Sequence, residues 1–235
     1  MFRGDHPELG RTMVRAWMLA RDLGHPRVGS EHLLLSLASD EGTVATVLTA
    51  HGATRIVLGE AVHHAAPTGA GAAADRESLA ALGIDLDRLL GPSGARALDR
   101  PPSRESLFPL GTARARRHCA LANPPIGLDT QAVYAASLRL ALARREREHR
   151  PEHLALTLVA LDPGAAWTLS AANVNRQALL THLAAAFPPP RRNPLLRAER
   201  RIALRHRHDY LIRHYQQTTG RTATDPSALT TLIGA

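Results

Sequence analysis

Residues 23–35 read LGHPRVGSEHLLL, and residues 150–158 return to the core of this stretch as RPEHLALTL. Both copies contain Glu-His-Leu followed by further leucines, and the two Glu-His pairs stand 121 positions apart. Repetition of this kind is the sequence signature of similar structural units within one chain. The spacing therefore predicts two related units.

The correspondence at this spacing extends beyond the motif. Leu35 and Leu37 recur as Leu156 and Leu158, Thr54-Arg55 as Asn175-Arg176, and Leu58 as Leu179. Gly52 is replaced by Asn173, and both residue types tolerate the left-handed backbone that ends a helix. We therefore expect a helix to end at the same place in each unit.

Composition favours an all-α fold, because only 3% of the residues are aromatic while Ala, Leu and Arg abound. Apolar spacing and capping residues predict the helices of the first unit. The first begins near Pro7 and ends at Gly24, the second has Ser30 as its N-cap, the third covers residues 43–50, and the fourth follows Thr54. A helix over residues 130–145 should precede the second motif.

Four segments follow from these patterns. We expect a first repeat over residues 1–65, an inter-repeat linker over 66–125 with one short helix near 78–90, and a second repeat over 126–187. The Ala-, Gly- and Pro-rich stretches 65–74 and 91–102 are typical of linkers. Three prolines at 188–190 cannot continue a helix, so a separate basic C-terminal extension is expected over 188–235.

All 29 basic residues are Arg, and the formal net charge is +8. Without Lys the chain has neither a Walker A lysine nor a Schiff-base amine, which excludes a complete P-loop ATPase. The single Cys119 cannot form an intramolecular disulfide, the N-terminus has no signal-peptide pattern, and no apolar run approaches the ~18 residues of a membrane span. We expect a cytoplasmic protein with no enzyme activity and no membrane contact.

The stretch 23–35 resembles the signature of the Clp N-terminal repeat, the family of substrate-recognition domains of the Clp unfoldases. The resemblance covers residues 1–65 well and 126–187 more weakly. It implies two pseudo-symmetric helical repeats in a stand-alone form without the ATPase modules. It also implies a non-catalytic domain that recruits substrates and adaptor proteins.

The resemblance also implies a ligand-binding set. Glu31 and Glu152 align with the acidic residues that hold a guanidinium in members that bind phosphorylated arginine, and a carboxylate suits that planar group. The threonines that help to hold the phosphate in those members fall at His6 and Gly127, so the hydroxyl donors expected for phosphate recognition are lost and binding of phosphoarginine is left open. Acidic residues in a first helical turn also complement the helix dipole, which leaves a purely structural role open.

Some relatives bind cyclic peptide antibiotics on the first helix. The residues that would form this apolar platform here are Phe2, Met13, Val14 and Trp17.

The histidines of the two motifs precede apolar runs, so we expect His32 and His153 to be buried and hydrogen-bonded. Residues 149–153, HRPEH, formally match an inverted zinc-peptidase motif. Pro151 biases Arg150 out of the helix that such ligands must share, so we predict no metal and no cofactor.

The C-terminal extension carries nine Arg against three acidic residues. Those that could bind the phosphates of a nucleic acid, or an acidic partner, are Arg197, Arg200, Arg201, Arg205, Arg207 and Arg213. The leading prediction is a non-catalytic adaptor or decoy that binds a Clp unfoldase, its substrates or adaptors, or a cyclic peptide. The alternative is a nucleic-acid-associated regulatory protein that acts through this extension.

Overall fold

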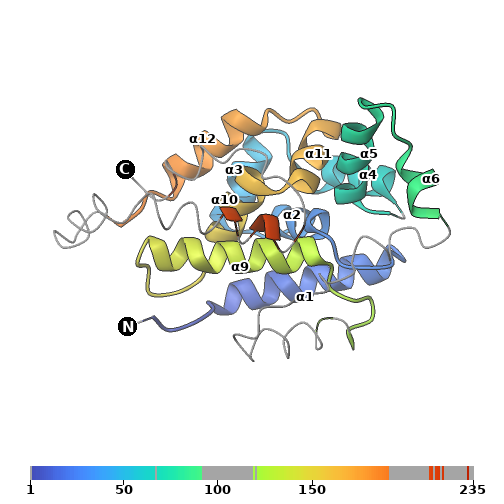
Figure 1. Cartoon of the computed structure of the whole chain (residues 1–235). Helices are drawn as coiled ribbons and strands as arrows, with labels where there is room; N and C mark the ends of the chain where they lie inside the picture. Colours follow the sequence, from blue (N-terminus) through green and yellow to red (C-terminus); the bar gives the residue numbers. More distant parts are fainter. Residues whose placement is uncertain are drawn as a thin grey trace.

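The computed structural model describes residues 2–66, 68–91, 119, 121–190, 212–213, 215–217, 219 and 232. Its regular elements over these residues are helices, with two isolated β-bridges (Figure 1). The all-α prediction is confirmed.

The two sequence repeats form two matching sets of four helices. The first set comprises α1 (Pro7–Asp22), α2 (Ser30–Ala38), α3 (Thr43–Ala50) and α4 (Arg55–Ala65). The second set comprises α9 (Leu128–Ala143), α10 (Pro151–Leu161), α11 (Pro163–Ala171) and α12 (Arg176–Ala186). Moved by 121 positions, each helix of the first set falls on its counterpart to within one residue at both ends, apart from the C-terminal end of α10, which is two residues longer than that of α2.

The helix ends also repeat. Gly52 has a φ of +80° and Asn173 a φ of +56°, as expected from their left-handed tolerance. The Thr54 side chain accepts a hydrogen bond from Val57 N, and Asn175 repeats this cap on α12 by accepting one from Ala178 N. The capping residues therefore start α4 and α12 at equivalent positions of the two repeats.

The expected N-cap of α2 is wrong by one residue. Gly29 has the extended backbone of the N-cap, and Ser30 is the first helical residue. The side chain that completes this helix start belongs to His32, whose Nδ1 accepts a hydrogen bond from Gly29 N at 3.0 Å. A capping side chain at position 30 is therefore unnecessary.

The two repeats are joined by an exchange of short extended segments. His6 N donates to His149 O at 2.8 Å, and the equivalent Gly127 N donates to Val28 O at 2.9 Å. Asp5 bridges to His149, and Val28 bridges to Ile126. The segment before the first helix of each repeat thus pairs with the segment before the second helix of the other repeat. This reciprocal pairing reflects the pseudo-two-fold symmetry of the fold.

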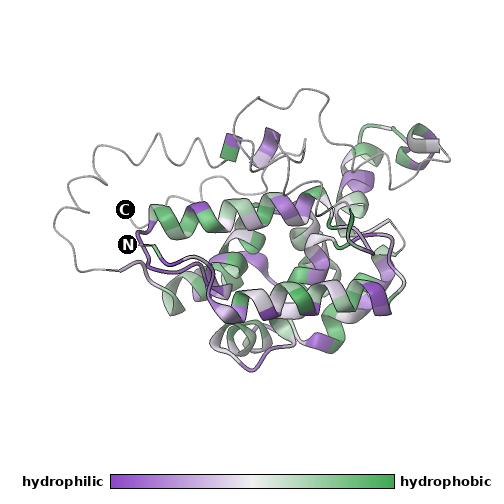
Figure 2. Ribbon diagram, turned by 90° about the horizontal axis from the view of Figure 1, so that it is seen from below, coloured by the Kyte–Doolittle hydropathy of each residue, from purple (hydrophilic) through white to green (hydrophobic). Residues whose placement is uncertain are grey.

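The core lies between the repeats, where α2 and α10 contact each other. Every residue of α2 is buried, and so are all residues of α10 except Glu152. α1 packs on α2 and α9 packs on α10, so these two long helices form the lower side of the molecule. In the view from below, hydrophilic and hydrophobic residues follow one another along the ribbon of α1 (Figure 2).

Two inter-repeat predictions need correction. The Ala- and Gly-rich stretch expected as a linker contains the start of α5 (Ala70–Ala80), which packs against α11. Alanine is the strongest helix former, and this packing partner cannot be recognised from the local sequence. The expected helix near 78–90 is interrupted at Gly83, where φ is +75°, and continues as the short α6 (Leu86–Leu90).

The C-terminal extension is not separate from the core. Tyr215 and Leu232 are 1% and 2% exposed and belong to the central apolar cluster. The Tyr215 hydroxyl donates to Asp162 Oδ2 at 2.8 Å. The triple proline ends a helix as predicted, but the chain beyond it returns to the second repeat.

Among the described helices none has by itself the length and apolar character of a membrane span. Two sharply bent pairs, α2 with α3 and α10 with α11, meet that standard only in combination.

Candidate functional site

Glu31 lies at the start of α2 and is only 1% exposed. The start of α5 covers it: a Cβ atom on Gly69 would lie 2.9 Å from Glu31 Oε1 and 3.6 Å from Arg27 Nη2. The guanidinium beside this carboxylate therefore belongs to the chain's own Arg27, which is also buried. The geometry leaves no surface opening for an external guanidinium at Glu31.

Three buried carboxylates gather around this position. Burial, followed by the nearby charge of Asp129, raises the pKa of Glu31 to about 7. Burial and Asp129 also raise the pKa of Asp162 to about 6, although Asp162 accepts hydrogen bonds from Ala165 N and the Tyr215 hydroxyl. The cluster disfavours negative charge and acts as part of the interior.

Glu152 occupies the equivalent place in α10 but is only partly buried. The exchange of segments puts His6 beside the second motif and Gly127 beside the first. A Cβ atom on Gly127 would lie 2.5 Å from Asp129 Oδ1 and 3.0 Å from Val28 O, so a threonine does not fit there. The two glutamates thus sit in separate and unequal surroundings.

The motif histidines have the same structural role in both repeats. His153 Nδ1 accepts a hydrogen bond from Arg150 N at 3.0 Å, as His32 Nδ1 does from Gly29 N. Each ring therefore carries its proton on Nε2, which faces His25 Nδ1 at 2.9 Å in the first repeat and Glu146 Oε1 at 3.1 Å in the second. The prediction of buried, hydrogen-bonded histidines is confirmed.

His25, Glu31 and His32 bring potential metal ligands to within 4.8 Å of one another. Coordination through His32 Nε2 would require a lone pair there, and therefore a proton on Nδ1 that would clash with Gly29 N–H. Burial lowers the pKa of both His25 and His32 to about 4, so the rings stay neutral. The hydrogen bonds account for the cluster without a metal ion.

A polar network that was not predicted from the sequence surrounds His149. Its Nδ1 lies 2.9 Å from Asp5 Oδ1, and its Nε2 lies 2.8 Å from Ser137 Oγ. This order resembles a Ser-His-Asp triad, but Ser137 is fully buried within α9 and its hydroxyl donates to Tyr134 O. No substrate could reach that hydroxyl.

Pseudo-symmetry gives this network a structural meaning. At the equivalent positions the other half has Ile126, Val28 and Ala16, which are apolar and partly or fully buried. One junction between the repeats is therefore held by side-chain hydrogen bonds and the other by apolar packing.

The predicted apolar platform on α1 is divided between two environments. Phe2, Met13 and Trp17 are partly buried; Met13 and Trp17 pack on the core, and Trp17 Nε1 donates to Pro124 O at 3.1 Å. Val14 is 59% exposed and faces outward. The four residues of the predicted platform therefore differ in exposure, and their role in ligand binding stays a prediction.

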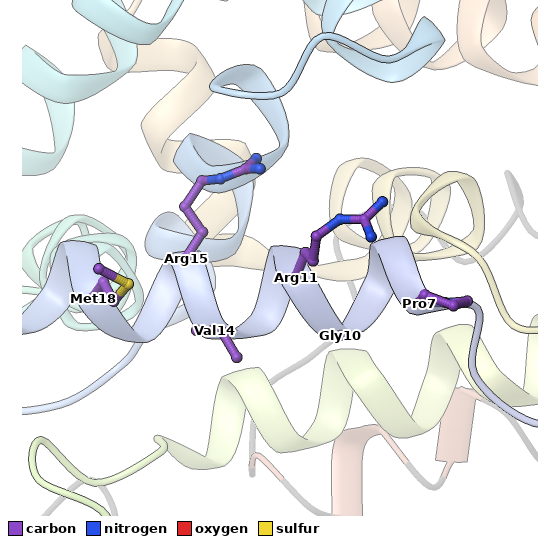
Figure 3. A pocket seen from close by; sticks show the side chains of 6 residues that line it. All are labelled: Pro7, Gly10, Arg11, Val14, Arg15 and Met18. Carbon is purple, nitrogen blue, oxygen red and sulfur yellow. The ribbon is translucent and has the colours of Figure 1, made fainter.

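An open groove of about 640 Å³ runs along α1 next to Val14 (Figure 3). Its lining comprises Pro7, Gly10, Arg11, Val14, Arg15 and Met18. Met18 was missed, although its position four residues after Val14 places both on one helical face. Arg11 and Arg15 extend from the same side of the helix, and Arg15 is held there by Ser36 O at 3.1 Å.

The basic extension falls largely outside the described residues, including Arg197, Arg200, Arg201, Arg205 and Arg207. Arg213 is helical and exposed, and Ile212 beside it packs against the core cluster.

Comparison with known protein families agrees with the fold. Residues 7–102 match the family described as the Clp repeat N-terminal domain, a stretch that includes the first four helices and the inserted α5 and α6. No curated protein matches the chain significantly. The matching segment and the all-helical architecture together identify a Clp repeat N-terminal domain in this chain.

Proposed function

We propose that this protein is a non-catalytic binding module, acting in the cytoplasm as an adaptor or decoy of a Clp system. It captures an acidic, partly apolar peptide segment and either presents it to a Clp unfoldase or withholds it. The observation that carries this proposal is the open groove on α1, where Val14 and Met18 are 59% and 44% exposed beside Arg11 and Arg15.

The groove combines two kinds of recognition. Val14 and Met18 offer apolar contact, and covering such a side chain fully contributes about 1.5–3 kcal/mol. Arg11 is on the surface, where its only described salt bridge is a 3.8 Å contact with the exposed Glu8. A guanidinium of this kind can bind a peptide carboxylate through two parallel hydrogen bonds. Both features favour a peptide with acidic and apolar residues.

The buried Glu31 supports this choice of site. Because Arg27 and α5 cover its carboxylate, we place the ligand on α1 and not at the start of α2. Phosphoarginine is therefore not the proposed ligand.

Two side chains with nucleophilic atoms, Ser137 and Cys119, support a binding role without chemistry. Ser137 is buried inside α9, and burial raises the pKa of the Cys119 thiol, which reduces its reactive thiolate. Neither is arranged to attack a substrate.

Affinity capture from a nuclease-treated native lysate at about 150 mM salt tests the proposal. The Val14→Asp, Met18→Asp double variant should recover at least about tenfold less Clp unfoldase or Clp substrate than the wild type. Ile56→Asp is the matched control, because Ile56 is 75% exposed on α4, away from the groove. Equal recovery by the double variant would refute the α1 site.

The same experiment examines the nucleic-acid alternative. Complexes formed by several Arg–phosphate contacts weaken by orders of magnitude between about 50 and 200 mM salt. Proteins that the wild type and the double variant recover equally, and only when the nuclease treatment is omitted, would favour the nucleic-acid alternative over the adaptor proposal.

A further inference from the structure

Two surface histidines from different repeats face each other. His51 is the C-cap residue of α3, and His182 lies in α12. His51 Nε2 and His182 Nδ1 are 2.9 Å apart, and the ring centroids are separated by 5.1 Å with an interplanar angle of 62°. One hydrogen bond thus links the two helices across the repeat boundary.

The fold does not require imidazoles at this crossing. Pseudo-symmetry relates His51 to Ala172, the C-cap residue of α11, and His182 to Ala61 in α4. α4 contacts α11 as α12 contacts α3. Because alanines suffice at one crossing, the histidine pair at the other is an addition to the shared architecture.

The distance between the two nitrogens is close to that of a metal chelate. Zinc binds imidazole nitrogen at about 2.0–2.1 Å, so two tetrahedral ligands lie about 3.3–3.4 Å apart. Opening the present 2.9 Å contact by about half an ångström would admit the ion. Both rings are at the surface, so water can supply the remaining ligands.

The tautomers of the two rings are also not fixed by other groups. The hydrogen bond between the rings is the single interaction found for either imidazole within the described part of the chain. Each nitrogen in the pair can therefore present a lone pair if the proton moves to the outer nitrogen of its ring. This differs from His32, where a backbone N–H fixes the tautomer.

We propose that His51 and His182 form a surface binding site for Zn²⁺ or a similar divalent transition-metal ion, which clamps α3 of the first repeat to α12 of the second. Imidazole nitrogen suits such ions, whereas Mg²⁺ and Ca²⁺ prefer oxygen ligands. Since the ion binds the folded arrangement, it raises the thermal stability of the protein.

Thermal unfolding at neutral pH with increasing ZnCl₂ tests the site, with excess chelator to reverse binding and MgCl₂ as the ion control. Zn²⁺ should raise the Tm of the wild type. His51→Ala, His182→Ala and the double variant should each raise the Zn²⁺ concentration at half-saturation by at least about tenfold. Loss of a residue that only hydrogen-bonds to a metal ligand already weakens metal binding that much. The three losses should be alike, because both ligands hold one ion.

The matched control is His64→Ala, which removes an exposed histidine from α4 and should respond as the wild type does. The alanine variants are expected to fold, because alanines occupy the symmetry-related crossing, and far-ultraviolet circular dichroism without metal checks this. A wild-type response retained by either pair variant, or no Zn²⁺ response of the wild type, would overturn the proposal.

Discussion

Replacing Glu31 by Gln should change how the stability of the protein depends on pH. Glu31 is 1% exposed, and burial followed by the charge of Asp129 raises its pKa from 4.5 to about 7. A carboxyl whose pKa is higher in the folded state destabilises that state as pH rises from the unfolded pKa to the folded one. The destabilisation is absent below about pH 4.5 and complete above about pH 7.

The size of this effect follows from the shift, because each pKa unit corresponds to 1.36 kcal/mol. Glutamine keeps the shape of the side chain but never ionises. The free energy of unfolding of Glu31→Gln minus that of the wild type should therefore increase by about 2–3 kcal/mol between pH 5 and pH 8. Contributions from His25 and His32 have the opposite pH dependence but occur in both proteins, so the difference removes them.

Urea unfolding monitored by far-ultraviolet circular dichroism at pH 5, 6, 7 and 8 measures this difference. A difference that stays constant across these four pH values would show that Glu31 titrates as an exposed carboxyl does. The covered position of Glu31 would then be wrong.

Three further substitutions test the structure by urea unfolding. Gly127→Ala should destabilise the protein by about 1–3 kcal/mol, because its Cβ would meet a carboxylate oxygen at 2.5 Å, whereas Gly10→Ala, with nothing within 4 Å, should stabilise α1 by up to about 1 kcal/mol. Tyr215→Phe should cost about 1–3 kcal/mol by removing the hydrogen bond to buried Asp162, and no loss would contradict the docking of the C-terminal extension. Asn173→Ala should cost about 1–2 kcal/mol and Asn173→Gly much less, because φ is +56°; equal effects would argue against the left-handed helix end.

The repeat architecture could be predicted because local signals coincide in both halves. Pro7, Thr54 and Asn175 mark helix starts, and Gly52 and Asn173 mark left-handed ends at the same spacing. These residues act on their own backbone or that of near neighbours, so one sequence suffices to interpret them.

The surroundings of the candidate site could not be predicted in the same way. Glu31 is covered by Gly69 and Ala70, which are far along the chain and reach it through the packing of α5 on α11. Likewise, Trp17 and Val14 differ in exposure because Pro124, from the segment before α9, lies against only one of them. Tertiary contacts of this kind leave no local pattern.

The central claim, capture of an acidic peptide segment on α1, is tested most directly by site-specific photo-crosslinking in native lysate. A photoreactive phenylalanine analogue would replace Val14 in one protein and Ile56 in a control, and Met18→Asp would be added to the first. We predict crosslinks to acidic segments of Clp substrates or unfoldase subunits at position 14, their loss with Met18→Asp, and none at position 56. Equal crosslinking at positions 14 and 56, or none at 14, would contradict the claim.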